Sequence, residues 1–114
     1  MEALKRPLFF TLMLFLIMAS GLRAQNLSPE QQEKIQQLTE NLETAVKQND
    51  FSSAAGYSGK IGYIYWNNSL YSEAIGNFEE ALDYNSKEGN RNGIKTIRYN
   101  LGRIYSEQEQ YQQA

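Results

Sequence analysis

Hydrophobic residues recur at steps of three and four along most of the chain, which is the spacing that places them on one side of an α-helix. This pattern predicts helices over about residues 29–47, 52–67, 71–86 and 93–107. No segment alternates strictly between apolar and polar residues, as a half-buried strand would. The sequence therefore predicts an all-α protein.

Each predicted helix has an apolar side that we expect to be buried against its neighbours. The expected inward positions of the first two helices are Ile35, Leu38, Leu42, Ala45, Val46, Ala54, Tyr57, Ile61, Ile64 and Tyr65. Those of the last two helices are Ala74, Ile75, Phe78, Ala81, Leu82, Tyr84, Ile94, Ile97, Leu101, Ile104 and Tyr105.

Polar residues mark the ends of the predicted helices. Ser28 and Gln31 fit the capping box that starts a helix, and Pro29 suits the first helical position. The second helix is expected to close at residues 67–69, Asn-Asn-Ser, because asparagine tolerates the left-handed backbone conformation. Residues 88–93 form the most turn-like stretch of the chain and separate the last two helices.

The sequence repeats itself with an offset of 40 residues. Residues 33–74 and 73–114 share 10 identical pairs in 42 positions. Five of these pairs lie within 13 consecutive residues, among them Gly62 with Gly102. A fixed period with apolar and small residues in phase is typical of a solenoid.

At these positions the chain resembles the tetratricopeptide repeat family, whose unit is a helical hairpin of about 34 residues. The residues that match the family pattern are Ile61, Gly62, Tyr65, Tyr71, Ala74, Phe78, Ala81 and Leu82, followed by Leu101, Gly102, Tyr105, Tyr111 and Ala114. The resemblance implies a right-handed α-solenoid of antiparallel helical hairpins that is incomplete at the C-terminus. The 40-residue period resembles the long-period bacterial type of the family.

The repeat pattern divides the chain into segments. Residues 51–88 match one repeat, and residues 89–114 match the start of a second, truncated one. Residues 25–50 are expected to form an N-terminal helix that is a degenerate repeat or a cap. The pattern departs from the family at Ser58 and Arg98, which stand where the family has tryptophan.

Tetratricopeptide arrays bind peptides in a concave groove lined by the first helix of each hairpin, so the resemblance implies a groove here. The candidate groove residues are Lys60, Tyr63, Trp66 and Asn67 in the first repeat, and Tyr99, Asn100, Arg103 and Glu107 in the second. Tryptophan, tyrosine and arginine are common interface anchors; the alternative is that these are ordinary solvated residues. The Lys/Asn/Arg set with which family members clamp a C-terminal carboxylate does not recur at matching positions.

The first 24 residues have the layout of a secretory signal peptide, with basic residues near the start and an apolar run of 11 residues at 8–18. A helix needs about 20 residues to cross a bilayer, so a membrane anchor is the weaker alternative. We expect cleavage after Ala24, with a cut after Ala19 or Gly21 as the alternative. The protein is therefore expected to be exported, either to the periplasm or out of the cell.

Composition excludes several classes of function. Without the leader the chain keeps 8 basic and 12 acidic residues, and the sequence pI is about 5.1, which argues against nucleic-acid binding. The chain has no His and no Cys, which excludes Cys–His and Ser–His–Asp catalysis, disulfides and lipid attachment at a leader cysteine. We expect no metal, because zinc sites made of carboxylates alone are rare, and no cofactor or enzyme activity.

The second copy of the repeat reaches Ala114 before its second helix can form. We therefore expect a fragment of a longer protein, or a chain that borrows the missing face from a second copy, because Ile97, Leu101 and Ile104 would otherwise face water. The expected function is that of a non-catalytic protein-interaction or scaffold module of an exported protein. The alternative is the N-terminal sensory region of a longer membrane-bound regulator, either a histidine kinase or a DNA-binding regulator.

Overall fold

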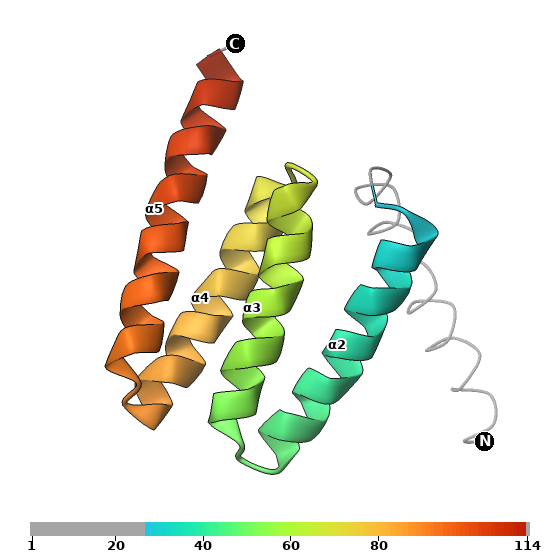
Figure 1. The fold of residues 1–114 in the computed structure, drawn as a ribbon, viewed down its shortest axis with the longest axis vertical. Coiled ribbons are helices and arrows are strands. Elements are labelled where there is room, and N and C mark those ends of the chain that lie inside the picture. The colour runs from blue at the N-terminus through green and yellow to red at the C-terminus, as the bar shows by residue number, and fades with distance from the viewer. Residues whose placement is uncertain (1–26, 114) are drawn as a thin grey trace, which may run out of the picture.

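Four helices make up the part of the chain that the computed structural model describes, residues 27–113 (Figure 1). They are α2, Pro29–Lys47; α3, Phe51–Asn67; α4, Tyr71–Glu88; and α5, Arg91–Gln113. This range contains no strand, and none of its helices is long and apolar enough to cross a membrane. The predicted all-α class is confirmed, whereas the predicted signal peptide at 1–24 and Ala114 lie outside the described residues.

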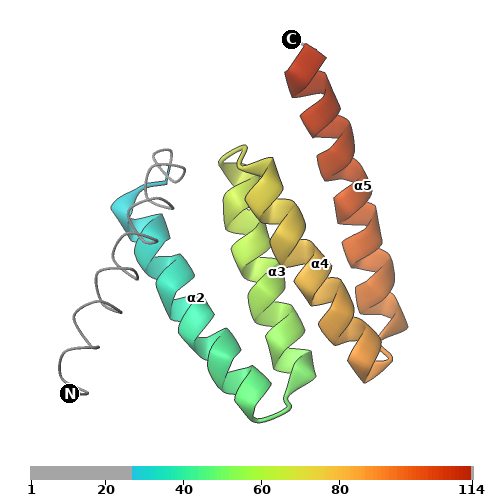
Figure 2. The same cartoon turned by 180° about the vertical axis from the view of Figure 1, so that it is seen from behind.

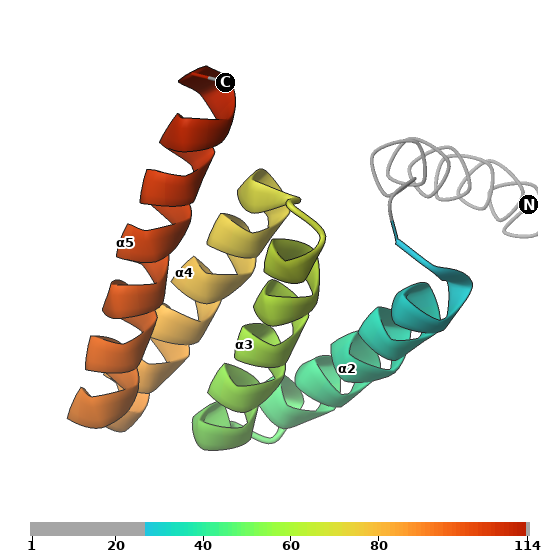
Figure 3. The same cartoon turned by 45° about the horizontal axis from the view of Figure 1, so that its top comes forward.

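The helices lie side by side in chain order, and each runs antiparallel to the one before it (Figures 1 and 2). α2 packs on α3, α3 on α4, and α4 on α5. The tilted view in Figure 3 shows the same row with α4 between α3 and α5. This is the stacked arrangement of helical hairpins that a repeat of this kind predicts.

Side-chain caps begin three of the helices, and at the start of α3 the Ser53 N–H donates to Asp50 Oδ1 at 3.1 Å. The predicted capping box starts α2, because Gln31 N donates to Ser28 Oγ and Ser28 N donates to Gln31 Oε1, both at 3.1 Å. At the start of α5, the Gly93 N–H donates to Asn90 Oδ1 at 3.0 Å. The Asn90 cap lets α5 begin at Arg91, inside the stretch predicted as a turn.

The end of α5 lies beyond its predicted end near residue 107, at Gln113. Residues 106–113 contain neither glycine nor proline and consist mainly of Glu and Gln. Both residue types have high helix propensity. The helix therefore continues although regularly spaced apolar residues are no longer present.

The end of α3 differs from its prediction. The left-handed residue is Ser69, with φ 59°, whereas Asn68 has φ −104°. The Asn68 side chain instead donates to the Ile64 carbonyl oxygen at 2.7 Å. Asparagine therefore closes this helix through its amide, and the prediction that it supplies the left-handed residue is wrong here; Asn49, with φ 56°, does so after α2.

Two hydrophobic clusters hold the row of helices together. The cluster between α2 and α3 contains Leu38, Leu42, Ala45, Ala54 and Ile61. The cluster between α4 and α5 contains Ala74, Phe78, Ala81, Ile97, Leu101 and Ile104. Tyr65 packs against both clusters, so α3 joins the two halves; Val46, an expected inward residue on the outer helix, is 37% exposed.

Helices α3 and α4 come close together at Gly62. A Cβ added there would lie 3.0 Å from Phe78 Cε2, and Phe78 is fully buried. Glycine at this position therefore makes room for the phenylalanine ring. The repeat-pattern residues of α3 and α4 are all buried or half-buried: Ile61, Gly62, Tyr65, Tyr71, Ala74, Phe78, Ala81 and Leu82.

The expectation that Ile97, Leu101 and Ile104 face water is wrong. Their exposed fractions are 7%, 8% and 0%, because the apolar side of α4 covers them. This side of α5 was expected to pack against a helix that follows α5 in the chain. In the structure it packs against α4. The reason for expecting a second chain at these residues therefore disappears.

Three repeat-pattern residues of α5 lie at the surface. A Cβ added at Gly102 would meet no atom within 4 Å, and Tyr105 and Tyr111 are 48% and 71% exposed. The Tyr105 hydroxyl is 3.4 Å from Glu79 Oε1, and the Tyr111 ring centroid is 6.2 Å from that of Tyr71. Within residues 27–113, these positions belong to neither hydrophobic cluster.

Candidate peptide-binding groove

Side chains of α3 and α5 meet, although the two helices are not consecutive. Asn100 Nδ2 donates to Tyr63 Oη at 2.6 Å, and Trp66 Nε1 donates to Glu107 Oε2 at 2.7 Å. All four residues were predicted to line the groove from the first helix of each hairpin. The structure thus brings these candidates together where side chains of α3 and α5 meet.

Tyr63 is held in place from three sides. Besides its hydrogen bond with the buried Asn100, its ring stacks near Trp66, with centroids 5.9 Å apart. The ring also meets the Phe78 ring edge-on at 5.0 Å. Tyr63 nevertheless remains 41% exposed, so it offers a fixed aromatic surface to a partner.

Arg103 lies between two aromatic rings. Its guanidinium carbon is 5.1 Å from the Trp66 ring centroid and 5.9 Å from that of Tyr99. The nearest described carboxylate, Glu107, is 3.9 Å from its Nη2, which is beyond hydrogen-bond distance. The side chain is 53% exposed, so its N–H donors face solvent.

These side chains form one group, which we call the aromatic–arginine cluster: Tyr63, Trp66, Tyr99, Asn100, Arg103 and Glu107. Lys60 and Asn67, the other two candidates, lie outside it. Lys60 Nζ is 5.9 Å from the Tyr57 ring centroid. Asn67 is exposed at the last position of α3.

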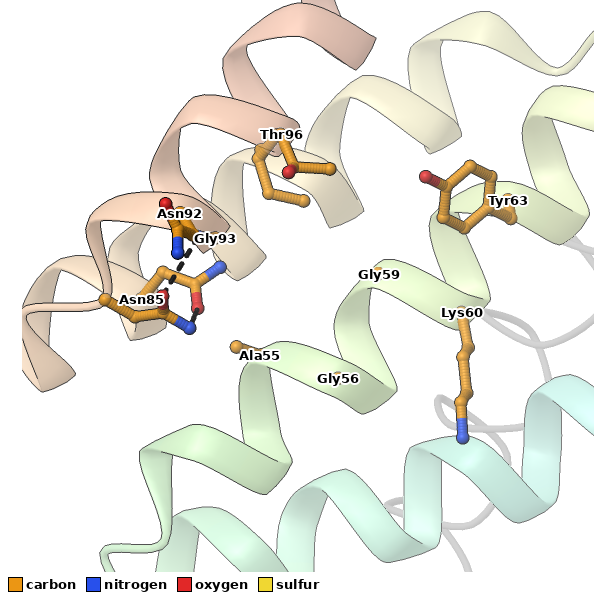
Figure 4. A pocket seen from close by; sticks show the side chains of 11 residues that line it. Ala55, Gly56, Gly59, Lys60, Tyr63, Asn85, Asn92, Gly93 and Thr96 are labelled. Atoms are coloured by element: carbon orange, nitrogen blue, oxygen red, sulfur yellow. Dashed lines mark hydrogen bonds between the residues drawn. The ribbon is translucent and has the colours of Figure 1, made fainter.

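A hollow of about 350 Å³ lies beside this cluster, between α3 and the start of α5 (Figure 4). Its lining consists of Ala55, Gly56, Gly59, Lys60, Tyr63, Asn85, Asn90, Asn92, Gly93, Thr96 and Ile97. Lys60 and Tyr63 are the two groove candidates of the sequence analysis among these residues, because those candidates came from the groove geometry that the family resemblance implies. The signal that could have revealed the hollow is the run of small residues at 55, 56 and 59, which shares one side of α3.

The described side chains contain no arrangement suited to metal binding. Within residues 27–113, no group of three or more acidic residues could hold a metal ion. Burial raises the pKa of the Tyr65 phenol, and the nearby Glu73 carboxylate raises it further. A raised pKa keeps this hydroxyl neutral, which suits the position of Tyr65 between the two hydrophobic clusters.

Comparison with known proteins identifies the family. A family model described as tetratricopeptide repeat matches residues 52–114, which is more than half of the chain. No curated protein and no solved structure gives a match. Tetratricopeptide repeats mediate protein–protein interactions and are generally non-catalytic. The chain belongs to the tetratricopeptide repeat family.

Proposed function

We propose that the chain is a non-catalytic interaction module that binds a segment of a partner protein along α3 and α5. The observation that carries the proposal is the aromatic–arginine cluster. It presents Tyr63 and Arg103 to solvent while packing and hydrogen bonds fix their positions. Fixed aromatic and arginine side chains lose little conformational entropy when a partner binds, which is why they anchor many interfaces.

The exposed guanidinium of Arg103 favours a partner segment that carries a carboxylate. Arg103 exposes N–H donors that can bind a carboxylate in bidentate fashion, and the adjacent Tyr99 is 67% exposed. Glu107 forms an ion pair with Arg103 at 3.9 Å through Oε1, while its other oxygen, Oε2, accepts the short hydrogen bond from Trp66. This ion pair is too long for a hydrogen bond, so the N–H donors of Arg103 are still available to a carboxylate from a partner.

We also propose that the protein is an exported member of the long-period bacterial type of the family. Two features support this proposal: the signal-peptide layout of residues 1–24 and the 40-residue offset of the repeat. Expression of the full chain in a bacterial host, followed by mass measurement of the product, tests export. The expected mass is that of a chain starting at Gln25, and an uncleaved product would contradict the proposal.

A peptide selection tests the binding function. The full chain is immobilised, peptides are selected from a displayed random library, and the affinities of the selected peptides are measured. Arg103→Ala is expected to weaken binding by about tenfold or more, as hot-spot residues do. The matched control is Arg98→Ala, because Arg98 is an exposed arginine on the same helix but outside the cluster. Equal effects of the two substitutions, or a selection that yields no binder, would refute the proposal.

A further inference from the structure

Two glycines of α3 have no packing reason to be glycine. A Cβ added at Gly56 or Gly59 would meet no atom within 4 Å, in contrast to Gly62, where it would meet the Phe78 ring. Glycine inside a helix is destabilising relative to alanine. The missing side chains instead leave open the hollow beside the cluster, whose α3 wall they form together with Ala55.

A second observation points to a ligand in this hollow. Asn85 is only 7% exposed and lies in the wall of the hollow (Figure 4). Its Oδ1 accepts a long hydrogen bond of 3.4 Å from Asn90 Nδ2. Its own Nδ2 makes no hydrogen bond with the described residues 27–113 and is not among their buried, unpaired polar atoms, so it is open to the hollow. An acceptor in the hollow would pair with this donor.

The position of Asn85 depends on Gly93. A Cβ added at Gly93 would lie 2.5 Å from Asn85 Oδ1, so any larger residue there would displace the amide. The first turn of α5 therefore keeps a glycine where the amide of α4 reaches the hollow. Gly59 on one wall and Gly93 on the other thus shape the space and its hydrogen-bonding group.

The residues that line the hollow disfavour a charged ligand. Lys60 is the only charged residue among them, and the Lys60 side chain extends away from Asn85 and Asn92 in Figure 4. Its ammonium lies 5.9 Å from the Tyr57 ring. The remaining lining offers aliphatic surface, one tyrosine ring, amides and the hydroxyl of Thr96. Such walls suit a side chain that is uncharged and ends in an oxygen acceptor.

We propose that the hollow binds a neutral side chain with a terminal oxygen acceptor, glutamine or tyrosine, from the partner segment. This inference rests on the proposed function and specifies what the groove recognises next to Arg103. Thr96 and Arg103 are seven positions apart on α5, or about 10 Å along the helix. An extended chain covers that length in about three residues, which sets the spacing between the neutral side chain and the residue that meets Arg103.

Side-chain analogues test the hollow without any peptide. The full chain, isotope-labelled for NMR, is titrated separately with propionamide, p-cresol, toluene and sodium propionate. Propionamide and p-cresol are expected to shift the backbone amides of Gly56, Gly59 and Gly93 and to saturate in the millimolar range. Toluene and propionate are expected to bind at least about fivefold more weakly, since neither is a neutral acceptor. Toluene binding as well as p-cresol, or no shift with any probe, would overturn the inference.

Two variants sharpen this test. Gly59→Leu fills the hollow and is expected to abolish the p-cresol shifts at Gly93, whereas Gly76→Leu, at an open glycine of α4, is expected to leave them unchanged. Asn85→Leu removes the amide at nearly the same size and is expected to reverse the order of p-cresol and toluene. An unchanged order in Asn85→Leu would overturn the role of Asn85 even if Gly59→Leu failed to fold.

The outcomes separate this inference from the proposed function. Selected peptides that depend on Arg103 but do not shift the Gly59 amide would overturn the inference and leave the proposed function standing. Binding of p-cresol and propionamide at the hollow, with no peptide selected, would support the neutral-acceptor site and refute the groove function.

Discussion

Glycines that look alike in the sequence have different surroundings in the structure. Gly62 makes room for the Phe78 ring, whereas Gly102, its equivalent one repeat later, faces open space. Gly59 also faces open space, but in the wall of a hollow rather than at the outer surface. The amino-acid type alone does not distinguish these three surroundings, because they depend on which residues of a neighbouring helix lie close to each glycine.

The effect of a larger residue at Gly62 follows from this contrast. Gly62→Leu is expected to destabilise the fold by ~1–3 kcal/mol, because the added side chain collides with the buried Phe78. Gly102→Leu is the matched control and is expected to be neutral or slightly stabilising, since helix propensity rises without a clash. Thermal unfolding followed by far-UV circular dichroism measures both. An unchanged melting temperature in Gly62→Leu would contradict the assigned register.

Glu107 is expected to limit the affinity of the groove for acidic partners. Its carboxylate lies 3.9 Å from Arg103 and partly neutralises that charge, while it also accepts the Trp66 hydrogen bond. Glu107→Gln keeps an acceptor for Trp66 and removes the negative charge. Acidic peptides from the selection should then bind about 1.4- to fivefold more tightly, in line with ~0.2–1 kcal/mol for an exposed ion pair.

Fluorescence polarisation at low and high salt measures this change. The gain should shrink at high salt, because screening weakens the attraction between Arg103 and the peptide. Glu109→Gln, at an exposed residue of the same helix, serves as the control and should change little. Weaker binding to the Glu107→Gln protein would show that the carboxylate supports the site rather than competing for it.

At the scale of the helices, sequence reasoning succeeded where the signal is local. Apolar spacing and the Ser28 cap predicted four helices close to their observed bounds, except at the end of α5, which extends to Gln113. The prediction that an asparagine takes the left-handed conformation after α3 failed. Ser69 takes it, and the Asn68 amide instead donates to the Ile64 carbonyl oxygen. Sequence reasoning also failed for the burial of Ile104, because the covering surface comes from α4. Local patterns locate a helix, but contacts between helices decide what each face meets.

The start of α3 is expected to respond to acid. Asp50 caps this helix, and hydrogen bonds from the side chain and the backbone N–H of Ser53 hold its pKa below the usual 3.8. A lowered carboxylate pKa means that the stabilisation is present at neutral pH and is lost as the pH falls below about 3.8 through the folded-state value. Asp50→Asn keeps an acceptor but does not titrate.

The free energy of unfolding of both proteins is measured with denaturant, from neutral pH down to pH values below the pKa of a free carboxyl group. The stability of the native sequence should fall relative to Asp50→Asn on acidification, since all other carboxylates titrate in both proteins. A constant difference in unfolding free energy across the pH range would show that the Asp50 cap does not contribute through its charge.

At the scale of the whole molecule, the described helices form a row in which each packs on its neighbours in the chain. The stability of such a row is approximately a sum of local units and the interfaces between them. Here the two hydrophobic clusters share Tyr65, which contacts both. Tyr65 therefore helps to link the α2–α3 half to the α4–α5 half, together with the contacts of Tyr63 and Trp66 with Phe78.

Removal of the Tyr65 ring is expected to weaken the coupling between these halves. Tyr65→Ala should cost about 2–3 kcal/mol, less than the ~3–5 kcal/mol of a fully buried aromatic residue, because Tyr65 is only half-buried. Hydrogen exchange should then show α2 and α5 opening with different free energies, and the denaturant transition should broaden. Tyr99→Ala, at a residue that is 67% exposed, should change the stability by less than about 0.5 kcal/mol. A sharp, single transition in Tyr65→Ala would mean that the other contacts between α3 and α4, among them those of Tyr63 and Trp66 with Phe78, couple the halves without it, and the groove would then keep its shape without the tyrosine.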